Sequence, residues 1–162
     1  MNTQPDNSIR VLIADDDEHI LQCYRSAFGS SDASSYVETL SCLEAELFEP
    51  QPAPEAPRFD VVACSQGRDA ISLAVDARRN GKPFDVVILD VRMPPGIDGV
   101  EAGSRIRQFD PDVEIVFVTG FSDLTMSELA SRVPPPVKLH YFNKPLSFMQ
   151  LAESVAEMVR AG

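Results

Sequence analysis

The sequence predicts a doubly wound α/β domain, in which five parallel strands form one sheet with helices on both faces. Two observations predict this fold class. Short apolar runs alternate with longer stretches that repeat apolar residues at helical spacing, which is typical of strand–helix units joined by right-handed crossovers. The apolar runs are also nearly continuous, as expected for strands covered on both faces. A chain of 162 residues with 44% hydrophobic content can bury one core, so we expect a single domain over residues 1–162.

The first predicted strand, residues 11–14, runs directly into three carboxylates, Asp15, Asp16 and Asp17. The carboxyl end of a buried parallel strand is where open α/β sheets hold their ligands. Two like charges about 4 Å apart repel by roughly 4 kcal/mol at an effective dielectric constant near 20, so a tight acidic cluster must be protonated, spread apart or neutralised by a cation. A hard divalent metal is the natural cation. Asp17 is expected instead to lie exposed at the start of the first helix, predicted over residues 16–28.

A long connection, residues 30–58, separates the first helix from the second predicted strand at residues 59–64. Apolar residues recur within it at helical spacing, which predicts one extra amphipathic helix of roughly three turns. The prolines that follow predict an extended strap, because proline fixes its own backbone angle and disfavours helix in the residue before it. The extra helix either covers an apolar flank of the domain or binds a partner or a second copy. The apolar residues are Val37, Leu40, Leu43 and Leu47, and the prolines are Pro50, Pro52, Pro54 and Pro57.

Three strands and four helices are predicted over the rest of the chain. Turn and capping residues mark their ends: Asn80-Gly81 stops one helix, Asp110-Pro111 stops the next, and Ser122 is the expected N-cap of the one after. In chain order, the predicted elements are a helix from residue 68 to about 80, a strand at 84–89, a helix at 100–109, a strand at 113–118, a helix at 122–132, a strand at 138–142 and a helix at 147–160.

The third, fourth and fifth predicted strands each lead into a side chain that can do chemistry. Asp90 follows the third strand, Thr119 and Gly120 follow the fourth, and Lys144 follows the fifth. Because the carboxyl ends of parallel strands meet at one edge of the sheet, these groups are expected beside the acids that follow the first strand. An acid pair, a further acid, a hydroxyl and an amine at four strand ends form a specific combination.

These residues, in this order, resemble the receiver domain of two-component response regulators. The resemblance covers nearly the whole chain and implies the strand order 2-1-3-4-5, which brings Asp16 and Asp90 together. Compared with this family, residues 30–58 are an insertion. The resemblance rests on the acidic cluster after the first strand, the stretch Leu89-Asp90-Val91-Arg92-Met93-Pro94 followed by Asp98-Gly99, the pair Thr119-Gly120 and the pair Lys144-Pro145.

The resemblance implies that Asp90 is a phosphoacceptor. Its carboxylate would attack the phosphorus of a phosphohistidine or a small phosphodonor and form an aspartyl phosphate. The step would need Mg²⁺ or Mn²⁺, held by Asp16 and Asp90, by Asp15 through water, and by the backbone carbonyl of Arg92. Lys144 would supply a fixed positive charge to the phosphoryl group.

The same resemblance implies a conformational switch. Thr119 would donate a hydroxyl hydrogen bond to the phosphoryl group, and Tyr141, three residues before Lys144, would swing inward on activation. A tyrosine that merely packs in a half-buried strand is the alternative. The loop after Asp90 is one residue longer than its commonest form in the family. Arg92 and Phe121 occupy positions that influence the access of water, and because both are large a long-lived phosphate is expected.

The implied partners are a histidine kinase or a histidine phosphotransfer protein that donates the phosphoryl group. The chain would be a signalling switch with no independent catalytic turnover. Its readout surface would be the helix at 122–132 with the last strand and last helix, and a homodimer through that face is an open alternative. A second reading is a non-phosphorylated interaction module that uses the inserted helix. A phosphohydrolase or nucleotide enzyme ranks last, because no glycine-rich phosphate loop follows any strand.

Composition excludes some other classes. The 25 acidic and 14 basic residues give a net charge of −11, which argues against intrinsic nucleic-acid binding. No apolar stretch approaches the ~20 residues that span a bilayer, and no signal peptide opens the sequence, so a cytoplasmic protein without membrane contact is expected. Cys23, Cys42 and Cys64 have no metal or redox spacing, and reduced, mostly buried thiols are expected.

Overall fold

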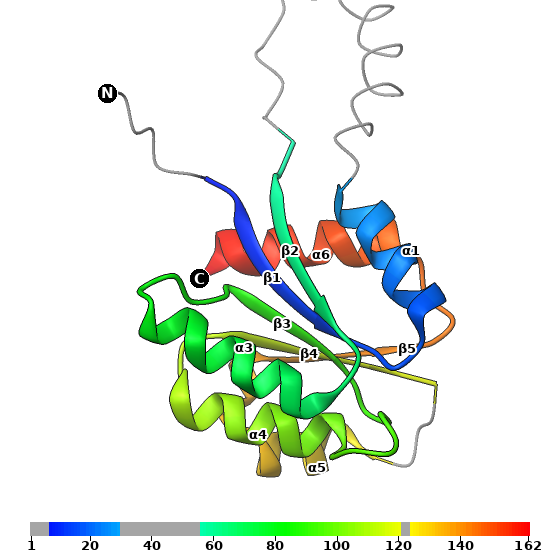
Figure 1. Ribbon diagram of the computed structural model, residues 1–162, viewed down its shortest axis with the longest axis vertical. Coiled ribbons are helices and arrows are strands. Elements are labelled where there is room, and N and C mark those ends of the chain that lie inside the picture. The colour runs from blue at the N-terminus through cyan, green and yellow to red at the C-terminus, as the bar shows by residue number, and fades with distance from the viewer. Residues whose placement is uncertain (1–6, 30–55, 121–123) are drawn as a thin grey trace, which may run out of the picture.

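The computed structural model describes residues 7–29, 56–120 and 124–162. They form one sheet of five parallel strands in the order β2-β1-β3-β4-β5 (Figure 1). This is the fold class and strand order that the sequence predicted, and each strand lies within two residues of its predicted bounds. The strands are β1 (Ile9–Ala14), β2 (Phe59–Cys64), β3 (Val86–Asp90), β4 (Glu114–Thr119) and β5 (Leu139–Asn143).

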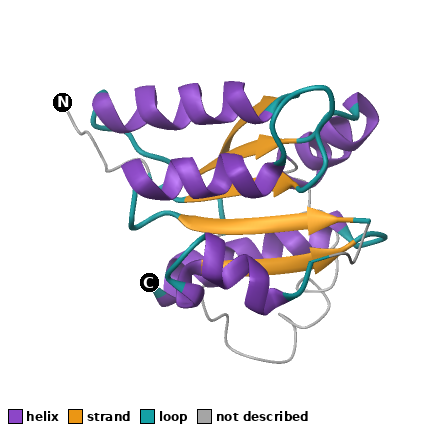
Figure 2. Ribbon diagram, turned by 90° about the horizontal axis from the view of Figure 1, so that it is seen from below, coloured by secondary structure: helices purple, strands orange, loops and turns teal. Residues whose placement is uncertain are grey.

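Helices cover both faces of the sheet (Figures 1 and 2). One face packs on two helices and the other on three. Because successive strand residues point to opposite sides, each strand contributes side chains to both cores. In β1, for example, Val11 and Ile13 belong to the core of the first face, whereas Leu12 and Ala14 belong to the core of the second. The first face carries α1 (Glu18–Gly29) and α6 (Phe148–Ala161), and the second carries α3 (Gly67–Arg79), α4 (Gly99–Phe109) and α5 (Met126–Arg132).

The start of α5 differs from the prediction. The helix begins at Met126, four residues after the predicted start, and Thr125 rather than Ser122 is its N-cap. The Thr125 hydroxyl accepts a hydrogen bond from the backbone N–H of Glu128, and the Glu128 carboxylate accepts one from the backbone N–H of Thr125. This reciprocal capping box satisfies two helix-end donors, which a single serine cap does not. Ser122 itself lies outside the described residues.

The start of α1 agrees with the expectation for Asp17. The helix begins at Glu18, and the exposed Asp17 side chain accepts a hydrogen bond of 2.9 Å from the backbone N–H of His19. Asp17 therefore acts as a cap, where the helix dipole favours a negative charge. The predicted inserted helix and the proline strap up to residue 55 lie outside the described residues. Among the helices that are described, none is long and apolar enough to cross a membrane.

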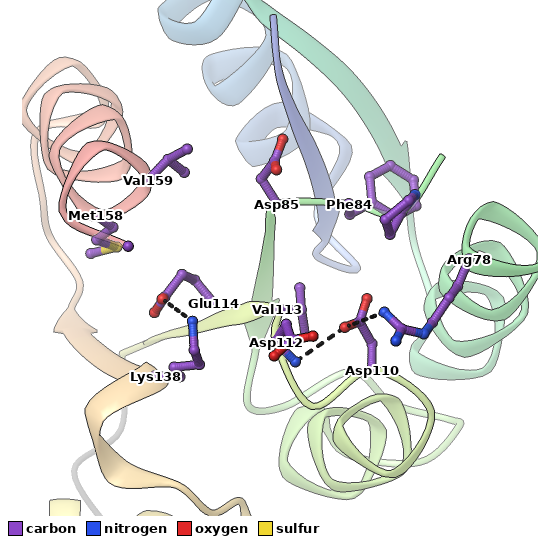
Figure 3. Close-up of a pocket in the computed structure, with 12 residues that line it drawn as sticks. Arg78, Phe84, Asp85, Asp110, Asp112, Val113, Glu114, Lys138, Met158 and Val159 are labelled. Atoms are coloured by element: carbon purple, nitrogen blue, oxygen red, sulfur yellow. Dashed lines mark hydrogen bonds and ion pairs between the residues drawn. The ribbon is translucent and has the colours of Figure 1, made fainter. Parts of the chain in front are cut away.

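Ion pairs fix the amino-terminal edge of the sheet around a small cavity of about 260 Å³ (Figure 3). Arg78 Nη1 lies 2.8 Å from Asp110 Oδ1, and Lys138 Nζ lies 3.1 Å from Glu114 Oε1. The second oxygen of Glu114 lies 2.9 Å from His140 Nε2. The largely buried carboxylate of Glu114 thus has a partner for each oxygen, as burial of a charge requires.

Arg107 is a buried cation at the same edge, with only 7% of its surface exposed. Its guanidinium donates hydrogen bonds to the backbone carbonyls of Pro111 (3.1 Å), Lys138 (2.8 Å) and Val113. It thereby ties the end of α4 to the segments that lead into β4 and β5. Burial lowers the pKa of Arg107, opposed by the nearby charge of Glu114.

Candidate functional site

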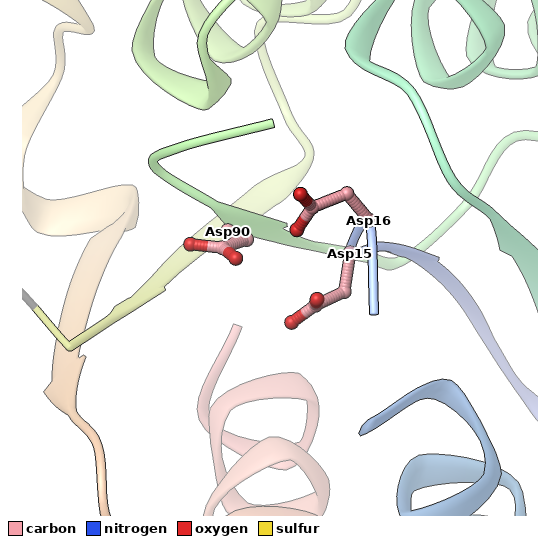
Figure 4. A group of neighbouring side chains, drawn as sticks. All are labelled: Asp15, Asp16 and Asp90. Atoms are coloured by element: carbon pink, nitrogen blue, oxygen red, sulfur yellow. The ribbon is translucent and has the colours of Figure 1, made fainter. Parts of the chain in front are cut away.

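The carboxyl-terminal edge of the sheet brings together the acids that follow β1 and end β3. Ala14 pairs with Leu89 in the β1–β3 register, so Asp15 and Asp90 follow from adjacent positions. Asp15, Asp16 and Asp90 each present a carboxylate oxygen, and these oxygens lie within 4.8 Å of one another (Figure 4). The strand ends predicted a shared sheet edge, and the strand order implied by the resemblance predicted that Asp16 and Asp90 meet there.

The three carboxylates differ in burial and in their backbone partners. Asp15 is 1% exposed and Asp90 is 9% exposed, whereas Asp16 faces solvent. Oδ1 of Asp15 accepts a hydrogen bond from the backbone N–H of Asp17 (3.0 Å), and Oδ1 of Asp90 accepts one from that of Arg92 (3.3 Å). Each buried carboxylate is therefore oriented through Oδ1 by the turn that follows it, which leaves Oδ2 to interact with other side chains of the cluster.

Lys144 places its ammonium group against both buried acids. Its Nζ donates to Oδ2 of Asp15 at 2.9 Å and to Oδ2 of Asp90 at 3.4 Å. Burial raises the pKa of Asp90, opposed by the charge of Lys144 and reinforced by that of Asp15. Burial by itself would lower the pKa of Lys144, but the hydrogen bond and the charges of the two acids outweigh it and raise that pKa. Lys144 thus stays charged and offsets one of three carboxylates.

The donor set fits a hard divalent cation. Three carboxylates with one ammonium group leave about two negative charges at the site, and oxygen ligands are those that Mg²⁺ and Mn²⁺ prefer. Asp16 is exposed and can turn toward an ion, while Asp15 is already bonded to Lys144. Arg92 lies on the loop beside the acids, with its backbone N–H bonded to Asp90.

Thr119 lies at the end of β4 next to Lys144. Its side chain is buried, and its backbone carbonyl accepts a 2.9 Å hydrogen bond from the backbone N–H of Lys144. Among the described residues other than its chain neighbours, a Cβ atom added to the next residue, Gly120, would meet no heavy atom nearer than Lys144 Cβ at 4.0 Å.

Tyr141 lies in β5, paired with Phe117, and packs against the core under α3, α4 and α5. Its hydroxyl oxygen is buried and has no hydrogen-bond partner among the described residues. The ring is thus turned into the domain, and the inward swing of Tyr141 on activation stays a prediction. Phe121, the other residue named for water access, lies outside the described residues.

Contacts within the loop between Asp90 and α4 hold its two ends together. Met93 is buried in the core, and the backbone N–H of Gly99 donates to the carbonyl of Val91 at 2.8 Å. A Cβ atom on Gly99 would overlap the backbone carbonyl of Asp90, so only glycine fits there.

A contact between this loop and Gln66 was not predicted from the sequence. Gln66, between β2 and α3, donates from Nε2 to the carbonyl of Pro94 at 3.4 Å. It is a polar residue just past a strand end, which was the signal available in the sequence.

Two of the three cysteines are described, and both are free thiols. Cys64 is half-buried at the end of β2, whereas Cys23 is exposed on α1, so the expectation of a buried thiol is wrong for Cys23. Burial raises the pKa of Cys64 to about 11, so its thiol is protonated near neutral pH. Neither cysteine belongs to the acidic cluster.

Comparison with known proteins identifies this arrangement. A family model described as the response regulator receiver domain matches residues 53–156, which is most of the chain. The match begins after β1, so Asp15 and Asp16 lie outside the matched residues and are joined to Asp90 by the geometry of the sheet.

Individual proteins agree with the family model. The chain is 31% identical over 84 residues to the response regulator receiver protein CpdR of Brucella abortus. These 84 residues are 52% of this chain and 67% of that protein. Curated relatives are matched over as little as 10% of their length. A response regulator receiver protein from Sinorhizobium medicae has the same fold with a TM-score of 0.64 and 24% identity, over 96% of this chain and 97% of that one. The response regulator protein TrrA of Thermotoga maritima, solved in complex with Mg²⁺-BeF, has a TM-score of 0.58 and 21% identity, over 93% of this chain and 98% of that one.

Proposed function

The chain belongs to the response regulator receiver domain family, and on that premise we propose that it is a switch controlled by phosphorylation of Asp90. The observation that carries the proposal is the contact group around Asp90. The carboxylate ends β3, lies 3.4 Å from the Lys144 ammonium group, and shares a cluster within 4.8 Å with two further acids. This arrangement pairs a nucleophile with a cation and with oxygen ligands for a metal.

The proposed chemistry is transfer of a phosphoryl group to a carboxylate oxygen. An oxygen of Asp90 attacks the phosphorus of a phosphohistidine, the phosphorus–nitrogen bond breaks, and the electron pair leaves with the histidine nitrogen. Asp16 and Asp90 would hold a Mg²⁺ or Mn²⁺ ion, with Asp15 through water and the carbonyl of Arg92. When bound, that ion supplies positive charge to the phosphoryl oxygens. The complex of TrrA with Mg²⁺-BeF supports this assignment.

Lys144 and Thr119 are the proposed phosphoryl partners. The Lys144 ammonium group turns from Asp15 toward a phosphoryl oxygen, and the Thr119 hydroxyl donates to another, with entry through the space at Gly120. Tyr141, in β5, would then swing inward. Phosphorylation would favour this conformation because the phosphoryl group interacts more strongly with it than with the unphosphorylated form's conformation.

The proposed donor is a histidine kinase or a histidine phosphotransfer protein, and no independent turnover is proposed. The readout surface, and the face of any homodimer, would be α5, β5 and α6. With a net charge of −11, no nucleic-acid contact is proposed for this domain. We propose one domain over residues 1–162 with an insertion at about 30–58. The expectation of a cytoplasmic protein stays a prediction.

The proposal is tested by intact mass after incubation with Mg²⁺ and acetyl phosphate. The wild-type chain should gain one phosphoryl group, and Asp90→Asn should gain none. Asp112→Asn is the matched control, since Asp112 is exposed at the opposite edge of the sheet. If the folded wild-type chain gains no phosphoryl group, a non-phosphorylated interaction module becomes the better description. If Asp90→Asn gains the group equally, another residue is the acceptor.

A further inference from the structure

The side chain of Gln66 contacts the loop that follows Asp90. Gln66 occupies the N-cap position of α3, yet its side chain makes no capping hydrogen bond to that helix. Its Nε2 instead donates to the carbonyl of Pro94. Its Oε1 lies only 2.7 Å from where a Cβ on Gly96 would stand. The amide group therefore lies along the loop backbone from Pro94 to Gly96 rather than over the end of its own helix.

The neighbouring residue strengthens this contact. A Cβ on Gly67 would lie 3.0 Å from Cγ1 of Ile97 and 3.3 Å from the Ile97 carbonyl oxygen. The first turn of α3 and the loop therefore approach with no side chain between them at Gly67. Such close approach is a characteristic use of glycine.

Gln66 reaches the part of the loop that other contacts leave exposed. Met93 is anchored in the core and Gly99 is bonded to Val91, whereas residues 94–96 are exposed. These exposed residues carry the one-residue extension of the loop. They also begin two positions after Arg92, whose backbone carbonyl is a proposed metal ligand.

We propose that Gln66 is a positioning residue for the phosphorylation site. By contacting residues 94–96, its amide restrains the loop that carries Arg92, whose carbonyl is a proposed metal ligand and whose side chain the family resemblance links to the access of water. The inference rests on the proposed function. Gln66 acts through the loop and takes no part in the transfer itself.

Gln66→Ala and Gly96→Ala test this link from its two sides. The first removes the amide, and the second pushes it away, since the space for a new Cβ is filled by the end of a flexible side chain. Gly96 does not have a positive φ, so alanine fits its backbone. Each variant should bind Mg²⁺ about threefold more weakly, the size expected for one long neutral hydrogen bond. The double variant should be no weaker than either single one.

The Mg²⁺ dissociation constant is measured by amide chemical shifts in the unphosphorylated chain, and the phosphoryl half-life by intact mass. In the variants the dissociation constant should rise and the phosphoryl half-life should shorten, with thermal unfolding checked to ensure a folded state. Gln108→Ala, exposed on α4, is the matched control and should leave both unchanged. Wild-type Mg²⁺ affinity in Gln66→Ala, or additive losses in the double variant, would overturn the inference. A wild-type chain without a phosphoryl adduct refutes the proposed function separately, because the Mg²⁺ measurement does not depend on phosphorylation.

Discussion

The two edges of the sheet hold similar charged residues in opposite balance. At the amino-terminal edge, Glu114 has a cationic or imidazole partner for each oxygen, and Asp110 is paired with Arg78. At the carboxyl-terminal edge, three clustered acids face the ammonium group of Lys144. The first arrangement is complete by itself and holds strands in place, whereas the second retains negative charge that a cation can neutralise. Charge balance, rather than the presence of buried charge, therefore separates the structural edge from the candidate site.

The comparison is tested most strongly at Arg107. Arg107→Met should lower the free energy of unfolding by about 3 kcal/mol, because three backbone carbonyls lose a buried donor. Urea unfolding measures the change. Arg105→Met is the control, since Arg105 is exposed and pairs with Glu101 on the same helix, and it should cost less than about 0.5 kcal/mol. Equal losses in the two variants would show that the buried guanidinium has no special role at this edge.

Lys144→Met should have a smaller effect that depends on metal. In metal-free solution the free energy of unfolding should fall by about 2 kcal/mol, because the buried carboxylate of Asp15 loses its cation. Saturating Mg²⁺ should shrink the difference, since an ion bound to the folded chain supplies the missing charge. Lys138→Met at the other edge is the matched control. Its loss of stability should stay the same with Mg²⁺, and a Mg²⁺-dependent change there would contradict the distinction between the edges.

Asp90→Asn should stabilise the metal-free chain by about 1 kcal/mol near pH 7, where one of several like charges is removed. Burial raises the pKa of Asp90 in the folded chain above its ordinary value of 3.8. The folded chain therefore binds this proton more tightly than the unfolded chain, and stability is lost as the pH rises from 3.8 through the folded pKa. The gain from Asn should disappear as the pH falls toward 3.8. Urea unfolding against pH measures it.

Asp110→Asn provides the opposite case for the same measurement. Asp110 is nearly buried and bonded to Arg78, so the substitution should destabilise the chain at neutral pH. If both substitutions lowered the free energy of unfolding equally at pH 7, the carboxyl-terminal edge would be as well neutralised as the other.

The sequence predicted the strands and the edge where Asp15, Asp90, Thr119 and Lys144 meet, because apolar runs mark buried parallel strands and parallel strand ends share an edge. It placed the start of α5 wrongly, although Thr125 and Glu128 have the spacing of a capping box. The prediction used Ser122, a single possible N-cap close to the end of β4, and overlooked the stronger signal, which is the capping-box pair Thr125 and Glu128.

Contacts between side chains and distant backbone were beyond prediction. Arg107 appears in the sequence as one more charged helix residue, and its burial depends on three carbonyls from two later segments. The reach of Gln66 to Pro94 likewise depends on how two loops at the sheet edge approach each other. Sequence periodicity reports which face of an element is apolar, and it carries no information on where a polar group finds its partner.

The contact between Lys144 and Asp15 joins residues 129 positions apart in the chain. During synthesis, the acids after β1 and Asp90 at the end of β3 emerge well before the last strand. Until β5 docks on β4, Lys144 is not held beside Asp90, and the acids repel one another without their cation. A nascent or partly folded chain therefore carries Asp90 but lacks the assembled site, and the contacts of Lys144 with both acids form only with the completed sheet.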